Sequence, residues 1–238
     1  MLPEVTVIYG ETTVELRFFE IYRSSEYLLL LAEGILTSAA LTVSAGIMGF
    51  VLAILLASAR HHRWPVLGQL SATFIEFVRN TPLIVQLFFV AFGLPLLLGY
   101  QWAFWAHALL ALIINFSAYF AEILRSGFLS VPIGQLEAAK TLGVPSFIAF
   151  WKILLPQAIA TMYPSLSSQF IFLFLTTGVI AEIGVRDLTF AGLFIDSRSF
   201  RSFEVFFTLT ILYIVMALSF KGILRLVFIK KFSWWSAP

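Results

Sequence analysis

Five long apolar stretches, separated by shorter polar segments, dominate the hydropathy pattern of this chain. A transmembrane helix needs about 20 mostly apolar residues, and each stretch approaches or exceeds that length. The third stretch opens with Trp102 and Trp105, whose indole rings favour the lipid headgroup level. The pattern predicts an all-α integral membrane protein with five transmembrane helices and a single domain over residues 1–238. The predicted spans are residues 34–59, 81–99, 102–124, 158–183 and 205–229.

The composition indicates that lipid is the main solvent of the chain. Of its 238 residues, 60% are hydrophobic and 12% are charged, whereas about a quarter of the residues of a soluble domain are charged. The chain has no cysteine, which excludes disulfides, thiolate metal ligands and a thiol nucleophile. Its three histidines, His61, His62 and His107, do not follow a zinc-binding spacing, so no metal and no bound cofactor are expected.

Basic residues are distributed unevenly between the predicted loops. Cytoplasmic loops of membrane proteins carry an excess of lysine and arginine. With the N-terminus outside and the C-terminus in the cytoplasm, ten basic residues lie inside and five outside. This orientation places residues 130–156 in the cytoplasm. The inside set is Arg60, Arg63, Arg79, Arg125, Lys140, Lys152, Lys221, Arg225, Lys230 and Lys231, and the outside set is Arg17, Arg23, Arg186, Arg198 and Arg201.

Three segments outside the spans have their own character. Residues 64–77 alternate in a helical way and are expected to lie along the cytoplasmic interface. Residues 184–204 have mixed charge and form either a solvated external connection or a surface that receives a binding protein. Residues 1–27 are acidic and lack the basic start of a signal peptide, so we expect an interfacial or extracytoplasmic position.

The first span carries small residues at spacings of four. Such residues let helices approach closely in lipid, where van der Waals packing replaces the hydrophobic drive. We expect tight packing along this face, either within the chain or across a dimer. The small residues are Ser38, Thr42, Ala45, Gly46, Gly49 and Ala53.

Polar side chains near one face of the third span are candidates for a substrate pathway. A carboxylate within a membrane segment is costly unless it faces protein or water, so Glu122 is a functional candidate. Alternatively, Glu122 pairs with Arg125 or Arg79 and holds helices together. Asn115 lies deeper and is the better pathway candidate, whereas a lone histidine near the outer interface is expected to be a satisfied polar residue. The face comprises His107, Asn115, Tyr119 and Glu122.

The fourth span adds neutral hydrogen-bonding groups. Ser165, Gln169 and Thr176 are spaced four and then seven residues apart. Together with Asn115 they predict a polar passage in the middle of the bilayer, with hydrogen bonding between helices as the alternative. Glu182 lies at the outer mouth, where it either receives a cationic substrate or pairs with a nearby arginine.

The loop before the fourth span carries the most specific pattern in the chain. Residues 137–156 fit E-A-A-x3-G-x9-I-x-L-P without a mismatch. This pattern resembles the cytoplasmic coupling loop of permeases of ATP-binding-cassette (ABC) importers, in which a short helix docks on a separate ATPase. A loop helix that matches by chance is the alternative, in which case Glu137 only favours the helix start through the dipole. The resemblance implies coupling roles for Gly134, Glu137, Ala138, Ala139, Gly143 and Pro156.

Residues 77–87 indicate a narrower family. They resemble the R-x-T-P-L-x-x-Q-L signature of polar amino acid ABC permeases, and the resemblance extends in order over about residues 33–230. It implies the type I ABC importer permease fold, a bacterial inner-membrane location and passage of a polar or charged amino acid into the cytoplasm by alternating access. The implied partners are an ATPase dimer that binds ATP and Mg²⁺, a second permease, an extracytoplasmic solute-binding protein and membrane lipid. Nucleic acid is not among them.

Two positions depart from the pattern of this family. Asn80 stands where the family usually has glycine, and residues 173–179 lack the lysine of a K-x-T-S-L stretch that many members carry. The second departure argues against carrying over a substrate role at that place. It also fits one partner of a heterodimer, whose two permeases can diverge.

The chain lacks the motifs of several other classes. No Gly-Lys dipeptide occurs, so there is no P-loop, and we expect a transport subunit and not an enzyme. The inverted repeats expected of a secondary transporter are not visible. A membrane scaffold without transport gives no reason for the coupling motif. A permease of the same class for another small polar solute stays open as an alternative.

Overall fold

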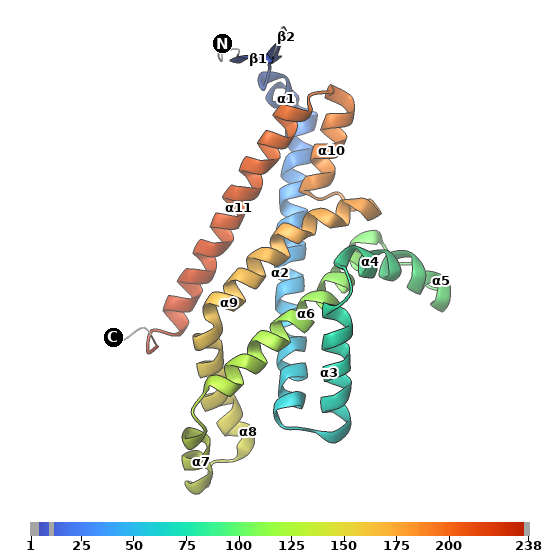
Figure 1. The fold of residues 1–238 in the computed structure, drawn as a ribbon. Helices are drawn as coiled ribbons and strands as arrows, with labels where there is room; N and C mark the ends of the chain where they lie inside the picture. The colour runs from blue at the N-terminus through green and yellow to red at the C-terminus, as the bar shows by residue number, and fades with distance from the viewer. Residues whose placement is uncertain (1–4, 10–11, 236–238) are drawn as a thin grey trace.

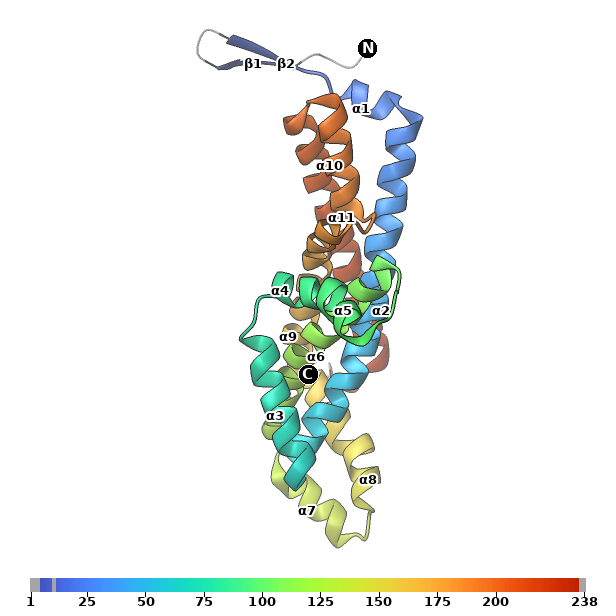
Figure 2. The same ribbon diagram turned by 90° about the vertical axis from the view of Figure 1, so that its right-hand side faces the viewer.

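The computed structural model describes residues 5–9 and 12–235, which form an elongated bundle of helices (Figure 1). A short antiparallel hairpin and α1 lie at one end, and α7 and α8 lie at the other (Figures 1 and 2). The helical bundle confirms the predicted fold class, and the hairpin is an addition that the hydropathy pattern does not predict. The elements are β1 (Val5–Tyr9), β2 (Thr12–Leu16), α1 (Phe19–Arg23), α2 (Ser25–His61), α3 (Pro65–Arg79), α4 (Leu83–Phe88), α5 (Leu94–Leu98), α6 (Phe104–Ser130), α7 (Ile133–Thr141), α8 (Ser146–Ala149), α9 (Leu155–Thr176), α10 (Leu188–Ser199) and α11 (Ser202–Lys231).

The described residues contain four helical stretches long and apolar enough to cross a membrane, or up to five if a bent pair counts as one span. In the bent pair, α3 meets the stretch Leu83–Leu98 at an angle of 108°. The predicted span of residues 81–99 corresponds to the second arm of this pair. The four single stretches are Ser25–His61, Phe104–Ser130, Ser146–Ile183 and Ser202–Lys231.

Helix α3, for which the sequence predicts a position along the cytoplasmic interface, packs against the bundle. It follows α2 after a short turn and runs back beside it (Figure 1). Ser71, Ile75 and Val78 are buried at the spacing of one helix face. Contacts with α2 and α6 therefore decide the position of this helix.

Two π-helical turns accompany prolines in the helical stretches. The turn Phe89–Gly93 is followed by Pro95, and the turn Phe150–Leu154 is followed by Pro156. Proline lacks a backbone N–H and clashes with the carbonyl four residues earlier, and a π turn locally relieves such a break. The stretch that contains α9 ends in a 3₁₀ turn, Thr177–Ile183, inside the predicted fourth span.

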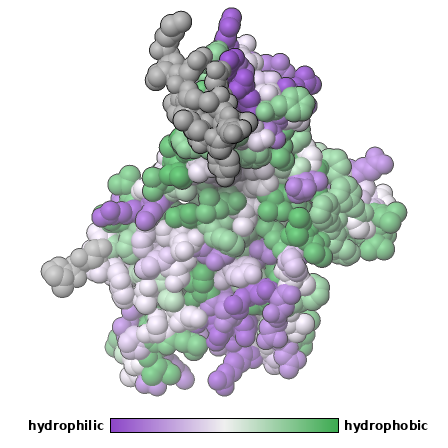
Figure 3. Space-filling model, turned by 45° about the horizontal axis from the view of Figure 1, so that its top comes forward, coloured by the Kyte–Doolittle hydropathy of each residue, from purple (hydrophilic) through white to green (hydrophobic). Residues whose placement is uncertain are grey.

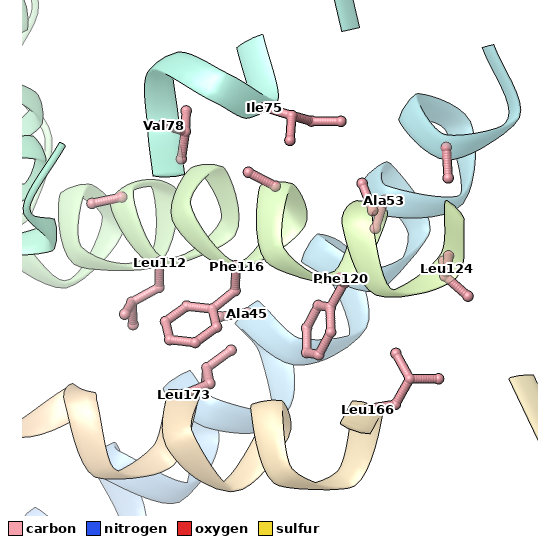
Figure 4. Packing of buried hydrophobic residues seen from close by; sticks show 14 of the residues in the cluster. Ala45, Ala53, Ile75, Val78, Leu112, Phe116, Phe120, Leu124, Leu166 and Leu173 are labelled. Atoms are coloured by element: carbon pink, nitrogen blue, oxygen red, sulfur yellow. The ribbon is translucent and has the colours of Figure 1, made fainter. Parts of the chain in front are cut away.

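The core lies where α6 crosses α2 and α9. Phe116 and Phe120 point from α6 toward Leu173 and Leu166 of α9, while α3 covers the same helix from the other side (Figure 4). The outer surface is apolar as well: hydrophobic side chains spread across the middle of the face in Figure 3, and hydrophilic ones gather toward its lower edge. An apolar core together with an apolar outer surface suits a membrane environment, since lipid replaces water around the middle of the bundle.

The small residues of the first span pack inside this chain. Ser38, Thr42, Ala45, Gly46, Gly49 and Ala53 are all buried in α2. A Cβ added at Gly46 would lie 2.4 Å from Cε2 of Phe170. The tight packing predicted for this face is confirmed, and the partner helices belong to the same subunit.

The segment of residues 184–204 is not the solvated connection that its charge predicts. It contains α10, which packs against α2 and α11. Leu188, Ala191 and Ile195 are buried at helical spacing, at no more than 1% exposure. The mixed charge of the segment obscures this face, although only Asp196 and Arg198 of its charged residues belong to α10 and both lie near the end of that helix.

Candidate functional site

The loop with the coupling motif projects beyond the long helices at one end of the molecule (Figures 1 and 2). Glu137 and Ala138 are exposed on α7, whereas Ala139 is buried. Gly134 is also exposed, and a Cβ added there would meet no atom within 4 Å. Because α7 begins at Ile133, Glu137 lies in its second turn, which corrects the expectation that Glu137 opens the helix. The helix dipole acts mainly on the first turn, so it gives little reason for an acid at this position.

Gly143 forms the turn that ends α7. Its φ is +75°, in the left-handed region that favours glycine. The Gly143 N–H donates to the Lys140 carbonyl at 3.0 Å and the Val144 N–H to the Ala139 carbonyl at 2.9 Å, the hydrogen bonds of a Schellman C-cap. No atom lies within 4 Å of an added Cβ, so a side chain here would meet backbone strain and no steric clash. The turn after α7 therefore depends on glycine at this position.

Large apolar side chains face outward from the loop. Ile133 and Leu142 are 71% and 81% exposed, although both lie outside every candidate span. Exposed apolar patches on parts of a protein outside lipid typically mark contacts with other proteins. The loop therefore has the surface of a protein contact and no cluster of groups suited to catalysis.

The end of α2 supports the inner side of this loop. The rings of His62 and Phe150 lie 5.6 Å apart, and those of His61 and Phe128 lie 5.4 Å apart. A cavity of about 220 Å³ separates the two histidines from the loop. Pro156 follows in the first turn of α9. The loop is thus connected to α2 through aromatic contacts and to α9 through the chain.

Asn115 joins α6 to the bend between α3 and α4. It is 4% exposed, and its Nδ2 donates to Gln86 Oε1 at 3.0 Å. Gln86 Nε2 in turn donates to the Val78 carbonyl at 2.8 Å and to Thr81 Oγ1 at 2.6 Å. These bonds satisfy buried polar groups at the break between two helices. The R-x-T-P-L-x-x-Q-L pattern contains Thr81 and Gln86, but it carries no sign that Asn115 completes the network.

Glu122 bridges α6 and α2. Its carboxylate accepts from Arg60 Nη1 at 2.9 Å and from Arg125 Nε at 2.9 Å. Arg79 lies over the ring of Tyr119, 5.6 Å from the centroid. The alternative in which Glu122 pairs with Arg125 or Arg79 is therefore confirmed for Arg125. The second partner, Arg60, is 62 positions away in the chain, so spacing could not identify it.

The polar residues of the fourth span have different surroundings. Ser165 is exposed, and Thr176 donates to two carbonyls of its own helix. Gln169 Nε2 is buried and has no hydrogen-bond partner in the described residues. Glu182 is exposed, and the ion pairs of the described residues do not include one with Arg186. No hydrogen bond found in these residues joins the set to α6, so the passage stays a prediction.

His107 occupies an aromatic enclosure near the start of α6. It is 2% exposed, and the ring of Tyr100 stacks on it with centroids 5.7 Å apart. Neither ring nitrogen has a hydrogen-bond partner among the residues that the structure describes, which corrects the expectation of a satisfied polar side chain. The same residues hold no group of three or more histidine or acidic side chains placed to bind a metal ion.

A buried acid that the sequence pattern did not single out lies where α10 begins. Asp187 is fully buried, and its Oδ1 accepts from the Phe190 N–H at 2.8 Å as the N-cap of α10. Its Oδ2 has no partner in the described part of the chain. Nearby, Ser38 Oγ accepts from the Leu188 N–H at 3.2 Å. Burial raises the pKa of Asp187 to about 6, because the charged form loses water.

The helical bundle with its projecting loop is the fold of a membrane transport subunit, and comparison with known proteins specifies it. The sequence model described as "Binding-protein-dependent transport system inner membrane component" matches residues 28–230. The chain belongs to this family. Membership confirms the predicted family and its location in the cell inner membrane as a protein that crosses it several times.

Individual relatives agree with this assignment. The L-cystine transport system permease protein TcyL of Bacillus subtilis (strain 168) is 36% identical over 186 residues, which cover 75% of this chain and 77% of the relative. The "Probable amino-acid ABC transporter permease protein PatM" of Vibrio harveyi is 33% identical over 169 residues, which cover 70% and 76%. A crystal structure of an amino acid ABC transporter with histidines is 31% identical, with a TM-score of 0.79 over 90% of this chain and 98% of that chain. The predicted permease fold is confirmed.

Proposed function

We propose that this chain is the permease of an ATP-driven importer that moves a polar or charged amino acid into the cytoplasm. The observation that carries the proposal is the projecting α7–α8 loop, where exposed Glu137 and Leu142 stand beside the fixed turn at Gly143. This surface suits docking to a separate ATPase. The amino acid substrate is supported by the cystine permease and the amino acid transporter among the similar proteins. Another small polar solute is the second candidate.

The proposed assembly contains two permeases, two ATPase chains and an extracytoplasmic solute-binding protein. The ATPases hold ATP and Mg²⁺, and this chain holds neither. When the ATPase pair closes, α7 moves as a rigid body, and Pro156 and His62 pass the displacement to α9 and α2. Because α6 lies between these two helices, the shift opens a passage alternately to each side. The N-terminus lies outside, and residues 130–156 meet the ATPase in the cytoplasm.

The proposed passage follows the polar groups of α6 and α9. The unpartnered Gln169 amide supports it, since a polar group without a partner is costly in a membrane. Asn115 joins the passage in the state in which its bond to Gln86 opens. The passage residues are Asn115, Tyr119, Glu122, Ser165, Gln169, Thr176 and Glu182.

Purification tests the assembly. The tagged chain is extracted from its membrane in mild detergent, and the proteins that remain bound are identified by mass spectrometry. We expect an ATPase with a P-loop in stoichiometric amount, and uptake of an amino acid after reconstitution with the binding protein. An isolated permease, or a complex without an ATPase, would contradict the proposal.

Cysteine labelling tests the passage separately. Asn115→Cys and Gln169→Cys can be introduced cleanly because the chain has no cysteine of its own. We expect both to react with a water-soluble thiol reagent, with reactivities that change when ATP closes the ATPases. Met48→Cys, on the exposed face of α2, is the lipid-facing control. We expect the control to stay unlabelled, and if both test positions also stay unlabelled in every state, the passage lies elsewhere.

A further inference from the structure

A groove of about 770 Å³ lies between α9 and α11, away from the coupling loop. Two exposed cations, Lys221 and Arg225, line it one helical turn apart on α11. Ser167 and Ser168 bring hydroxyl groups from α9. Within the part of the chain that the structure describes, no ion pair or hydrogen bond engages either cation. Two unpaired positive charges beside hydroxyl donors form a site for an anion.

The depth of the two cations corresponds to a lipid headgroup. From Ser202, where α11 begins, to Lys221 the helix advances about 29 Å at its rise of about 1.5 Å per residue. The hydrocarbon core of a bilayer is about 30 Å thick. A span that begins at one interface therefore brings Lys221 and Arg225 to the opposite interface, where the phosphates of the lipids lie.

A second groove, of about 520 Å³, follows along the same two helices on the side of the hydrocarbon core. Leu175 of α9 and Ile214 and Leu218 of α11 line it with apolar side chains. Leu218 precedes Lys221 by one helical turn. Read along α11, the lining is apolar first and cationic at the end, which is the order of acyl chain and phosphate in an acidic phospholipid.

We propose that the groove between α9 and α11 binds an acidic phospholipid. Its phosphate lies between Lys221 and Arg225, which donate charge-assisted hydrogen bonds, and the hydroxyls of Ser167 and Ser168 donate to the remaining oxygens. One acyl chain follows Leu218 toward the second groove. Basic pockets between transmembrane helices bind anionic headgroups by this combination of charge and fit. The lipid fills the space between the two helices and so sets their separation.

Titration with phosphatidylglycerol tests the site. The purified transporter complex in neutral detergent is titrated with this lipid, and bound lipid is counted by native mass spectrometry. K221Q/R225Q is compared with K230Q/K231Q, which removes the same charge from the end of the same helix outside the groove. We expect binding to weaken about thirtyfold in the groove variant, about fivefold per cation, and to stay unchanged in the control. Phosphatidylcholine with the same chains should bind weakly to all three proteins.

Each of the other outcomes overturns the proposal. Equal binding by the two variants means that the cations do not form the site. Displacement of the lipid by millimolar glycerol phosphate would assign the groove to a free phosphate, because that probe carries the charge without acyl chains. Dissociation of a second permease from K221Q/R225Q would assign the groove to a contact between subunits, and displacement by an amino acid would assign it to the passage. None of these readouts depends on uptake, so they leave the proposed function untouched.

Discussion

Helices α6 and α11 reverse the relation that hydropathy predicts between apolar character and burial. Helix α11 is the more apolar of the two, yet 28% of its most apolar 18 residues are buried inside the chain, compared with 61% for α6. Lipid surrounds an apolar side chain as well as protein does, so apolar character alone draws no helix to the centre of a membrane bundle. Helix α6, the less apolar of the two, occupies the centre because its small and polar side chains interact more favourably with other helices than with lipid.

Residue size and polar partners explain the difference. Helix α6 presents small side chains such as Ala111, Ala118 and Ala121 to its neighbours, each at 0% exposure. These residues allow close approach of α2 and α9, and two polar side chains of α6 find partners on other helices, Glu122 on α2 and Asn115 on α4. Helix α11 carries exposed branched side chains, including Ile214 and Val215, that need no protein partner. Hydropathy therefore selects the segments that enter the membrane, and packing selects the one at the centre.

Gly127→Leu is expected to have the largest effect on stability. A Cβ at Gly127 in α6 would lie 2.8 Å from Met162 Cγ and 3.0 Å from the Ala158 carbonyl oxygen. The larger side chain forces α6 and α9 apart and costs about 3 kcal/mol. Gly222→Leu in α11, where an added Cβ meets nothing within 4 Å, is the matched control and should change the free energy of unfolding by less than about 1 kcal/mol. Equal losses of the free energy of unfolding in detergent micelles would contradict the conclusion that α6 is packed more tightly than α11.

Asp187→Asn extends the comparison to α10, which packs against both α2 and α11. Burial raises the pKa of Asp187 from 3.8 to about 6. As the pH rises from about 4 to 6, the folded protein keeps this proton while the unfolded chain loses it, so stability falls by up to about 3 kcal/mol and stays lower above that range. The amide still accepts from the Phe190 N–H but carries no charge.

We therefore expect the variant and the parent protein to have equal free energies of unfolding near about pH 4. Above about pH 6 the variant should be the more stable by up to about 3 kcal/mol. Chemical denaturation in micelles across this range measures the difference, and the other carboxylates cancel because both proteins share them. A difference that does not change with pH would show that Asp187 titrates normally.

Glu122→Gln tests the polar contacts that hold α6 to α2. The substitution leaves Arg60 and Arg125 without their shared carboxylate. Charge-assisted hydrogen bonds contribute about 1.5 to 3 kcal/mol each to stability, and these side chains are partly exposed, so we expect a loss of about 2 kcal/mol. Glu76→Gln, an exposed acid on α3, is the control and should change stability by less than about 0.5 kcal/mol. Similar values for the two variants would mean that packing alone centres α6.

Gly143→Leu should have the smallest effect on stability and a large effect on transport. A side chain in the left-handed region costs about 1 to 2 kcal/mol, and the open space around Gly143 adds no clash. The strain opens the turn after α7, so ATP hydrolysis in the assembled transporter should continue while uptake falls. Gly143→Asn is the control, since asparagine tolerates this conformation. If uptake by Gly143→Leu stays coupled to ATP hydrolysis, the turn has no role in the mechanism.

Local patterns in the sequence predicted several parts of the fold and the site. The small-residue face of α2, the turn at Gly143 and the pair of Glu122 with Arg125 follow from spacing within one helix or one turn. Two predictions at the joints between helices were wrong, namely a solvated segment at α10 and a satisfied His107. His107 is enclosed by the nearby rings of Tyr100 and Trp102, whereas the surroundings of α10 come from α2, a helix far away in the chain. The network of Asn115 with Gln86 and the bridge of Arg60 to Glu122 were missed for the same reason.

By itself, the sequence determined that this protein is a membrane-embedded helical bundle of a transport-permease family, because apolar length, helical spacing and turn chemistry act over a few residues. Only the tertiary structure decided which helix lies at the centre, how α3 and α4 bend around Pro82, and that Lys221 and Arg225 face a groove on α9. These features depend on the fit between distant surfaces. In lipid that fit rests on side-chain shape and polar pairing, which a linear pattern of hydropathy does not contain.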